Sequence, residues 1–416
     1  MAGLLVLIIM IGCAAYFFLK STFVKSFAFV MAAIGSTFAA FGYYELLANV
    51  FLNHREDNSY TAIVPWAQPL SFVLLFILVF AILQTIVTQL TLKNTIDLGT
   101  LPEQIGRAVC GLIFGMILAG VLLTALAMGP LPDQYPYQRF DPSAANADNP
   151  NGVFFNPDSF VSGLFSLVSR GSLSGQTSFA SVHPGFINEA FLNRLSQAPV
   201  LTPNKGIDVP KKEAAWLAPE GLNYAAEPNQ QARPVEAKSG HTLVIVRAGI
   251  TKNSFREAAE FSTSQLRIIC MEKDKMENPA SAKSVAVYPI GYLVPAKQAE
   301  GKAPVELQAK NLGDMIKIVR ADFAADVKYI DWVAYLPSDY VPVAVAFKQN
   351  NLETITPKLA QWPDNQQTET LTKPAAPKPA EPAPAEPNAA APAQEPDSAE
   401  DANAAADTND ANSAEQ

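Results

Sequence analysis

Four long apolar stretches occupy the first 130 residues, and the chain after them is predominantly polar. A helix needs about 20 apolar residues to cross the hydrocarbon core of a bilayer. A segment inside lipid must also satisfy its backbone hydrogen bonds internally, which a helix does. The pattern therefore predicts a bundle of four transmembrane helices in contact with the lipid bilayer. The stretches cover residues 4–19, 27–50, 69–90 and 108–128 of a predicted membrane domain 1–130.

The polar part divides into three segments by composition. Residues 131–240 are rich in Pro, Asn and Gly and are predicted to form a connector with short helices near 157–168 and 184–195. Residues 241–352 contain short alternating runs separated by turn formers, which predicts a β-rich, sandwich-like soluble domain. Residues 363–416 are dominated by Pro, Ala and acidic or amide residues. Such a segment buries too little surface to fold, so a disordered tail is predicted.

Six runs within the soluble domain predict strands because they are rich in β-branched and aromatic residues. These runs are residues 242–250, 265–271, 284–294, 315–319, 329–335 and 341–347.

The charges beside the apolar stretches predict the orientation. The loops after the first and third stretches carry Lys20, Lys25, Lys93 and Arg107, whereas the opposite side carries Arg55 and Arg139. The positive-inside rule places the side with more Lys and Arg in the cytoplasm. Both termini and the β-rich domain are then predicted to be extracytoplasmic. The prediction is therefore a membrane protein with several passes and an extracytoplasmic C-terminal domain.

Small residues at three- and four-residue spacing predict how the helices pack. The fourth stretch has Gly111, Gly115 and Ala119, with Gly106 just before it, and the second has Gly35, Ala39 and Gly42. Such spacing places the small residues on one helix face and allows two backbones to approach closely. We expect the second and fourth helices to pack through these faces, within one chain or by self-association.

Glu45 is the carboxylate that stands out near a membrane helix end. It follows Tyr43 and Tyr44, and Tyr is enriched at membrane interfaces. One interpretation is that Glu45 reaches water among the lipid headgroups. The other is a functional carboxylate, because ionisable residues in membrane helices often serve transport.

Composition argues against several other functions. The formal charge of −9 and the lack of a basic patch exclude nucleic acid as a partner. The three His residues, His54, His183 and His241, are each predicted to be ordinary surface or turn residues. The run 171–175 resembles a nucleophile elbow but has Leu173 where the nucleophilic Ser belongs. Phosphate-loop, dinucleotide, zinc and calcium patterns are missing, so the sequence predicts no enzyme, cofactor or metal site.

The chain has three cysteines. Cys13 and Cys110 lie in predicted membrane helices, and Cys270 lies in a predicted strand as a core residue. Cleavage before Cys13, as in a lipoprotein, is the alternative for the first stretch. That stretch lacks the basic residues that precede a signal sequence.

Residues 1–130 resemble the colicin V production protein family, which comprises bacterial inner-membrane proteins with about four spans. The resemblance rests on a short opening helix, the run 20–27 leading into a helix of small residues, an apolar third helix, and the run 107–115 that opens the fourth. The family's acid-base pair is incomplete here, because Gly106 precedes Arg107 and the nearest acid is Glu103. The resemblance implies a role in toxin production or export, or in envelope homeostasis, and no enzyme activity.

The sequence as a whole predicts a non-enzymatic inner-membrane scaffold. Its helices are expected to self-associate, and its β domain is expected to bind an unidentified envelope protein. The alternative is a small oligomeric channel or transporter component, against which the few polar residues inside the stretches argue. A membrane-anchored enzyme is a third possibility that requires an unusual site in the β domain.

Overall fold

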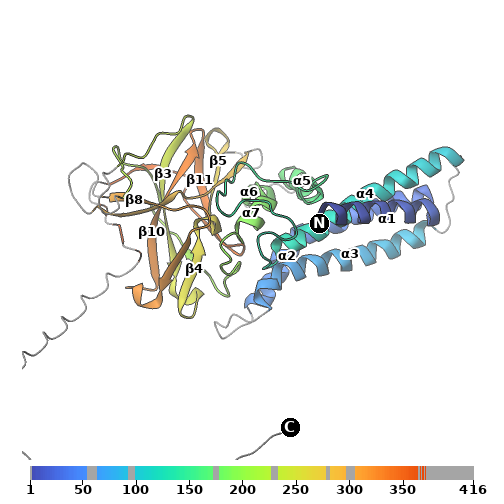
Figure 1. Cartoon of the computed structure of the whole chain (residues 1–416), viewed down its shortest axis with the longest axis horizontal. Helices are drawn as coiled ribbons and strands as arrows, with labels where there is room; N and C mark the ends of the chain where they lie inside the picture. Colours follow the sequence, from blue (N-terminus) through green and yellow to red (C-terminus); the bar gives the residue numbers. More distant parts are fainter. Residues whose placement is uncertain are drawn as a thin grey trace, which may run out of the picture. The chain divides into compact units, whose positions relative to one another are not determined.

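Four helices long and apolar enough to cross a membrane follow one another from the N-terminus (Figure 1). They are α1 (Ala2–Lys20), α2 (Phe23–Asn53), α3 (Ala67–Thr91) and α4 (Thr100–Met128). All four predicted helices are therefore confirmed as helices, each somewhat longer than its apolar stretch. The computed structural model describes residues 2–53, 63–91, 99–171, 178–225, 233–277, 282–296, 305–363, 366, 368–369 and 371. These residues all fall in one compact unit, 1–373.

The first turns of α4 show why this helix starts earlier than its apolar stretch. Pro102 is tolerated there because its missing N–H would have no helical partner. Glu103 lies in the first turn, where a negative charge favours the helix dipole. Arg107 donates to the carbonyl of Ser21 at 2.9 Å, so the start of α4 is tied to the α1–α2 connection.

Helices α2 and α4 contact each other within the chain, as predicted, but Gly111 and Gly115 of α4 face α1. A Cβ on Gly111 would lie 2.5 Å from Ala14 Cα, and one on Gly115 would lie 2.7 Å from Met10 Cα, so both glycines contact the backbone of α1. Ala119 is fully buried in a cluster that includes Met10 of α1. The small residues of α4 do allow a close approach of two backbones, and the helix that approaches is α1.

The small residues of α2 have other neighbours as well. A Cβ on Gly35 would lie 3.3 Å from Leu83 of α3, and one on Gly42 would lie 3.9 Å from Phe165 of the connector. Ala39 on the same helix is half-buried. Gly106 contacts the ring of Phe23, at the start of α2. Among the predicted small residues of α4, Gly106 is therefore one that contacts α2.

The connector forms three helices: α5 (Pro157–Arg170), α6 (Phe179–Val182) and α7 (Phe186–Leu192). Pro157 occupies the first turn of α5, where proline is favoured. The ring of Phe165 stacks on Phe41 of α2 with centroids 5.4 Å apart. Both predicted short helices therefore exist, although the second ends three residues earlier than predicted.

Within the described residues, the β-rich region contains three sheets. One has seven strands in the order β13-β2-β3-β10-β7-β8, with β1 also paired to β3. A second has four strands in the order β12-β11-β5-β6, and the third pairs β4 with β9. The strands are β1 (Ile207–Asp208), β2 (Ala215–Leu217), β3 (His241–Thr251), β4 (Ala258–Ser262), β5 (Leu266–Glu272), β6 (Ser284–Val287), β7 (Gly291–Pro295), β8 (Val305–Ala309), β9 (Met315–Val319), β10 (Val327–Pro337), β11 (Tyr340–Phe347), β12 (Asn351–Thr354) and β13 (Ala360–Gln361).

The limits of the β region differ from the prediction. The sheet takes β1 and β2 from the predicted connector, and β13 follows residue 352. The predicted strand 284–294 is two strands, because Pro289 interrupts it, and β6 and β7 belong to different sheets. Thr368 donates to Asp331 of β10, so the predicted tail starts with structured residues. Residues 372–416, which make up most of that tail, lie outside the described residues.

The core forms around β3 and β10, which are buried on both faces. Val246 and Trp332 belong to a cluster shared with Ile268 of β5. On the opposite face, Ile245 and Val333 pack in a cluster with Trp216 and Trp362. Successive side chains of a strand point to opposite faces. The nearly continuous apolar run in β3 follows from this double burial.

Candidate functional site

A group of four charged side chains, three of them buried, joins α2 to the connector and to the β region. Glu45 lies on α2, His183 directly follows α6, Glu189 lies on α7 and Arg267 lies on β5. We call these four residues the His183 network. Residues His183, Glu189 and Arg267 are each at most 6% exposed.

The imidazole of His183 bridges the two carboxylates. Its Nδ1 lies 2.8 Å from Glu189 Oε2, and its Nε2 lies 3.0 Å from Glu45 Oε1. Tyr44 donates its hydroxyl to the same Glu45 oxygen at 2.8 Å. Arg267 forms an ion pair with Glu189 on the side of the β region. A continuous path of charged contacts therefore runs from α2 to β5.

The network is electrically balanced. Burial lowers the pKa of His183, but the neighbouring carboxylates of Glu189 and Glu45 raise it to about 9, so the imidazole is protonated at neutral pH. Burial also acts against the Glu189 carboxylate, yet Arg267 and His183 hold its pKa below the usual value. Two cations and two anions thus compensate one another, as buried charges must.

Aromatic rings surround the network. The ring of His183 lies 5.1 Å from that of Phe179 and 5.5 Å from that of Phe186. Phe41 and Tyr44 of α2 pack edge-on against Phe186. This apolar surround strengthens the interactions between the charges and limits access of solvent to them.

The cavity beside the network is small. Its volume is about 10 Å³, which is room for about one water molecule. Gln265, Gln349 and Asn193 line it, and each has a buried amide atom without a hydrogen-bond partner among the described residues. The site can hold charges and exchange a proton, but it has no space for an organic substrate.

The turn between β11 and β12 adds a second link to the helices. Gln68 of α3 donates to the carbonyl of Gln349 at 3.1 Å. The neighbouring Lys348 has its side chain buried, and its Nζ donates to the carbonyl of Glu260 at 3.2 Å. Burial lowers the pKa of Lys348 to about 7. This lysine is therefore a second titratable group close to the same junction.

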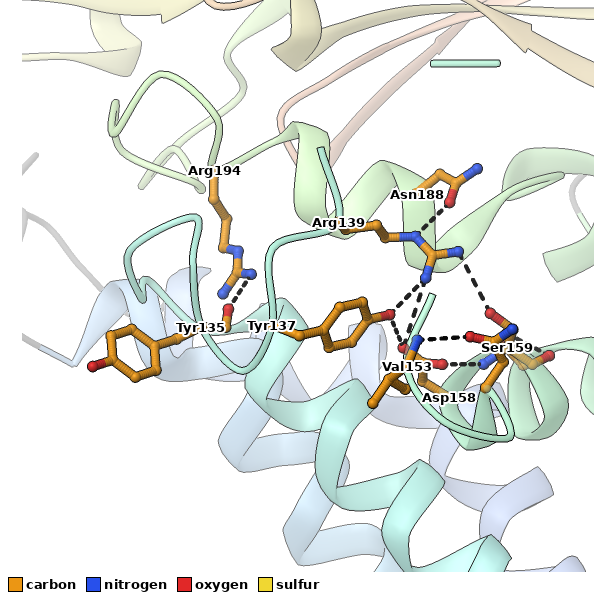
Figure 2. Close-up of polar contacts among 10 residues, drawn as sticks. Tyr135, Tyr137, Arg139, Val153, Asp158, Ser159, Asn188 and Arg194 are labelled. Carbon is orange, nitrogen blue, oxygen red and sulfur yellow. Dashed lines mark hydrogen bonds and ion pairs between the residues drawn. The ribbon is translucent and has the colours of Figure 1, made fainter. Parts of the chain in front are cut away.

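A further polar cluster links separate parts of the connector to one another. Figure 2 shows Arg139 between Asn188 and Ser159, with the hydroxyl of Tyr137 directed at Asp158. Arg139 Nε donates to Asn188 Oδ1 at 2.6 Å, and Nη1 donates to Tyr137 at 2.6 Å. These contacts fix α5 and α7 to the chain segment that leaves α4.

The sequence predicted part of this site. Glu45 was a candidate, and its carboxylate contacts His183 as well as Tyr44. The expectation that His183 is an ordinary turn residue is wrong, because it is buried and paired on both ring nitrogens. His241 lies at the start of β3 as expected, whereas His54 lies outside the described residues. Glu189 and Arg267 were missed.

Two further kinds of candidate site are the cysteines and possible metal ligands. Cys13, Cys110 and Cys270 are free thiols. Within the described part of the chain, no group of His, Cys, Asp and Glu is arranged to hold a metal ion. Comparisons with protein-family models, curated proteins and solved structures found no match. The resemblance to colicin V production proteins therefore stays a prediction from the residues quoted above.

The raised pKa of His183 predicts a pH-dependent stability. The folded-state value of about 9 exceeds the ordinary 6.5, so the stabilisation is complete below pH 6.5 and is lost as the pH rises towards 9. The shift corresponds to about 3 kcal/mol. We expect the difference in unfolding free energy between the wild-type protein and His183→Gln to shrink over this interval. Denaturation in detergent at pH 6, 7.5 and 9 measures it, and a constant difference would contradict the proposed charge state.

The lowered pKa of Lys348 predicts that stability changes with pH in the opposite direction. Its folded-state pKa of about 7 lies below the ordinary 10.5, so the folded state binds fewer protons than the unfolded state between these values. Stability from this group rises with pH, by at most about 1.4 kcal/mol per pH unit. In Lys348→Met, the same denaturation series is expected to show a steeper fall of stability above pH 7 than the wild-type protein. An unchanged slope would mean that the lysine is not buried in solution.

Proposed function

We propose that this chain is a non-enzymatic protein of the bacterial inner membrane that presents its β region to an envelope partner. The single observation that carries the proposal is the His183 network, which connects the β region to α2 through the buried His183, Glu189 and Arg267 and through Glu45. A freely tethered domain would not need such a link. A rigid link favours a role in which the position of the β region relative to the membrane matters.

The expected orientation supports an envelope role. Lys20, Lys25 and Arg107 gather at the end of the helices away from Glu45, and the positive-inside rule assigns that end to the cytoplasm. The β region then lies outside the cytoplasm. We also infer that its two larger sheets pack face to face as a sandwich, because Val246 of β3 and Ile268 of β5 share one core.

A groove on the β region is the partner site we favour. It has a volume of about 670 Å³ and lies between the segment 142–148 and the residues around Tyr288 and Asn311. Lys238 and Asp314 give it a mixed charge. Such a groove suits a protein segment with both charged and apolar side chains. Through this partner the chain would act in toxin production or export, or in envelope homeostasis, as the family resemblance implies.

Photocrosslinking in living cells tests the partner proposal. A photoreactive amino acid replaces Tyr335, which lines the groove, and in the control it replaces Tyr340 on β11, which is not among the groove residues. We expect a covalent adduct with one envelope protein from the groove position only. Equal adducts from both positions, or none, would contradict partner binding at the groove.

Two further measurements separate the alternatives. Alkaline phosphatase and a cytoplasm-only fluorescent reporter, each fused after Gln416, test the orientation without removing the buried Trp362 or the paired strand β13. Ion flux through the purified protein in liposomes tests the channel alternative. Phosphatase activity without flux is the result expected here, and flux would favour the channel.

A further inference from the structure

Helix α5 carries an apolar stripe that its own contacts leave uncovered. Phe160 is 39% exposed and Leu167 is 72% exposed, with half-buried Leu164 between them. These positions are three and four residues apart and therefore share one face of the helix. Just before α5, Phe154 and Phe155 are 51% and 57% exposed. A contiguous exposed patch of this kind on a polar region usually marks an interaction surface.

The depth of α5 follows from its contacts with the membrane helices. Lys25 and Glu45 are 20 residues apart on α2, which is about 30 Å at 1.5 Å per residue and equals the thickness of the hydrocarbon core. Phe165 of α5 stacks on Phe41, one turn from Glu45. The helix therefore lies at the level where the spans leave the hydrocarbon.

Contacts with α1 and α4 place α5 at the same level. A Cβ on Gly3, at the start of α1, would lie 3.5 Å from Phe154 Cβ. A Cβ on Gly120 of α4 would lie 2.8 Å from Val161 of α5 and would also touch the carbonyl of Pro157. Phe154, just before α5, thus adjoins the start of α1, where Leu4 and Leu5 are exposed.

The other faces of α5 suit a position at a membrane surface. Val161 and Phe165 are buried against α4 and α2. Ser159, Ser162 and Ser166 line a pocket of mixed polarity together with Arg139 and Arg170, and Leu167 lies at its border with the stripe. Arg170 lies in the last turn and is exposed, where it can meet a phosphate headgroup. An amphipathic helix with this division lies in the interface plane, its apolar face about 5–10 Å below the headgroups.

We propose that α5 is an interfacial helix. Its stripe of Phe160, Leu164 and Leu167 is buried in the lipid surface on the side of the β region, together with Phe154 and Phe155, which precede the helix. This inference rests on the proposed membrane location of the bundle. The helix would fix the height and the tilt of the β region, because α5 and α7 are joined through Arg139 (Figure 2).

Spin labels on the full chain in lipid nanodiscs test this proposal. Cys13, Cys110 and Cys270 are replaced by Ala, and single cysteines carry nitroxides at Phe160 and Leu167. Val319 of β9 is the matched control, since it is also apolar and also 39% exposed. Ile11 of α1, which is 62% exposed, reports the membrane interior. Power saturation with oxygen and with a water-soluble nickel complex measures depth at each site.

We expect the ratio of oxygen to nickel accessibility at Phe160 and Leu167 to lie between the values at Val319 and Ile11. A lipid-like Ile11 with an aqueous Leu167 would overturn the interfacial helix and leave the membrane location intact. An aqueous Ile11 would instead overturn the membrane location itself. Protection of Leu167 from both reagents would mean that protein covers the stripe, which also overturns the proposal.

Discussion

Replacing Glu189 with Ala is expected to lower the free energy of unfolding by roughly 3–5 kcal/mol, the usual cost of breaking a buried ion pair. The carboxylate lies between His183 and Arg267, and its removal leaves Arg267 without its ion-pair partner and His183 with Glu45 as its remaining carboxylate. Water cannot solvate either cation, since the side chains of His183 and Arg267 are at most 7% exposed. The loss should therefore exceed that of any single surface ion pair.

Lys205 provides the matched control. It pairs with Asp208 at 3.2 Å and with Glu353 at 2.8 Å, but its side chain is 57% exposed. Exposed pairs of this kind contribute about 0–1 kcal/mol. Lys205→Ala removes two salt bridges on the surface, whereas Glu189→Ala removes two in the interior. The comparison separates burial from the mere number of charges lost.

Tryptophan fluorescence during denaturation in mixed micelles measures both variants. Trp216, Trp332 and Trp362 lie in the β region and Trp66 lies just before α3, so the signal reports chiefly on the β region. Limited proteolysis of the connector provides a second readout, because α7 should be cleaved faster in Glu189→Ala. If this variant is as stable as Lys205→Ala, the His183 network does not hold the β region in place.

Hydropathy and alternation predicted the elements that are long enough to carry a pattern. The four long apolar helices and the strands β3, β5, β9, β10 and β11 all follow from it. Strands of two residues, such as β1 and β13, have no period to detect, and only their partners β3 and β2 make them strands. The strand predicted at 284–294 failed for a local reason, because Pro289 cannot donate a ladder hydrogen bond.

The functional site was harder to predict because its members are distant in sequence. Glu45 and His183 are 138 residues apart, and nothing in either local segment names the other. A usable signal did exist, since His183 stands among Phe179, Phe186 and Phe191 in an otherwise polar connector. A histidine in an aromatic stretch needs a polar partner if the stretch is buried.

Small-residue spacing has a similar limit. It predicts that some backbone approaches the glycine face, but it carries no information about which helix does so. Gly111 and Gly115 contact α1 at Cys13, Ala14 and Met10. The prediction of close packing and the prediction of the partner therefore depend on different information.

Gly115→Leu is the substitution expected to disturb the helical bundle most. The new Cβ would lie 2.7 Å from Met10 Cα and 3.2 Å from the carbonyl of Ile9, so the clash is with the backbone of α1 and no rotamer relieves it. Overpacking of a well-packed interior costs about 1–3 kcal/mol and occasionally more. Because here the backbone itself must move, we expect at least the upper end of this range and separation of α1 from α4.

Gly12→Leu is the matched control for this prediction. Gly12 belongs to α1, and a Cβ there would meet nothing within 4 Å. Heating followed by size-exclusion chromatography of a fluorescent fusion measures the midpoint at which the folded peak is lost. We expect Gly115→Leu to lower this midpoint strongly and Gly12→Leu to leave it near the wild-type value. If Gly115→Leu only changes the oligomeric state at an unchanged midpoint, the glycine face serves self-association, and its packing against α1 is not what stabilises the bundle.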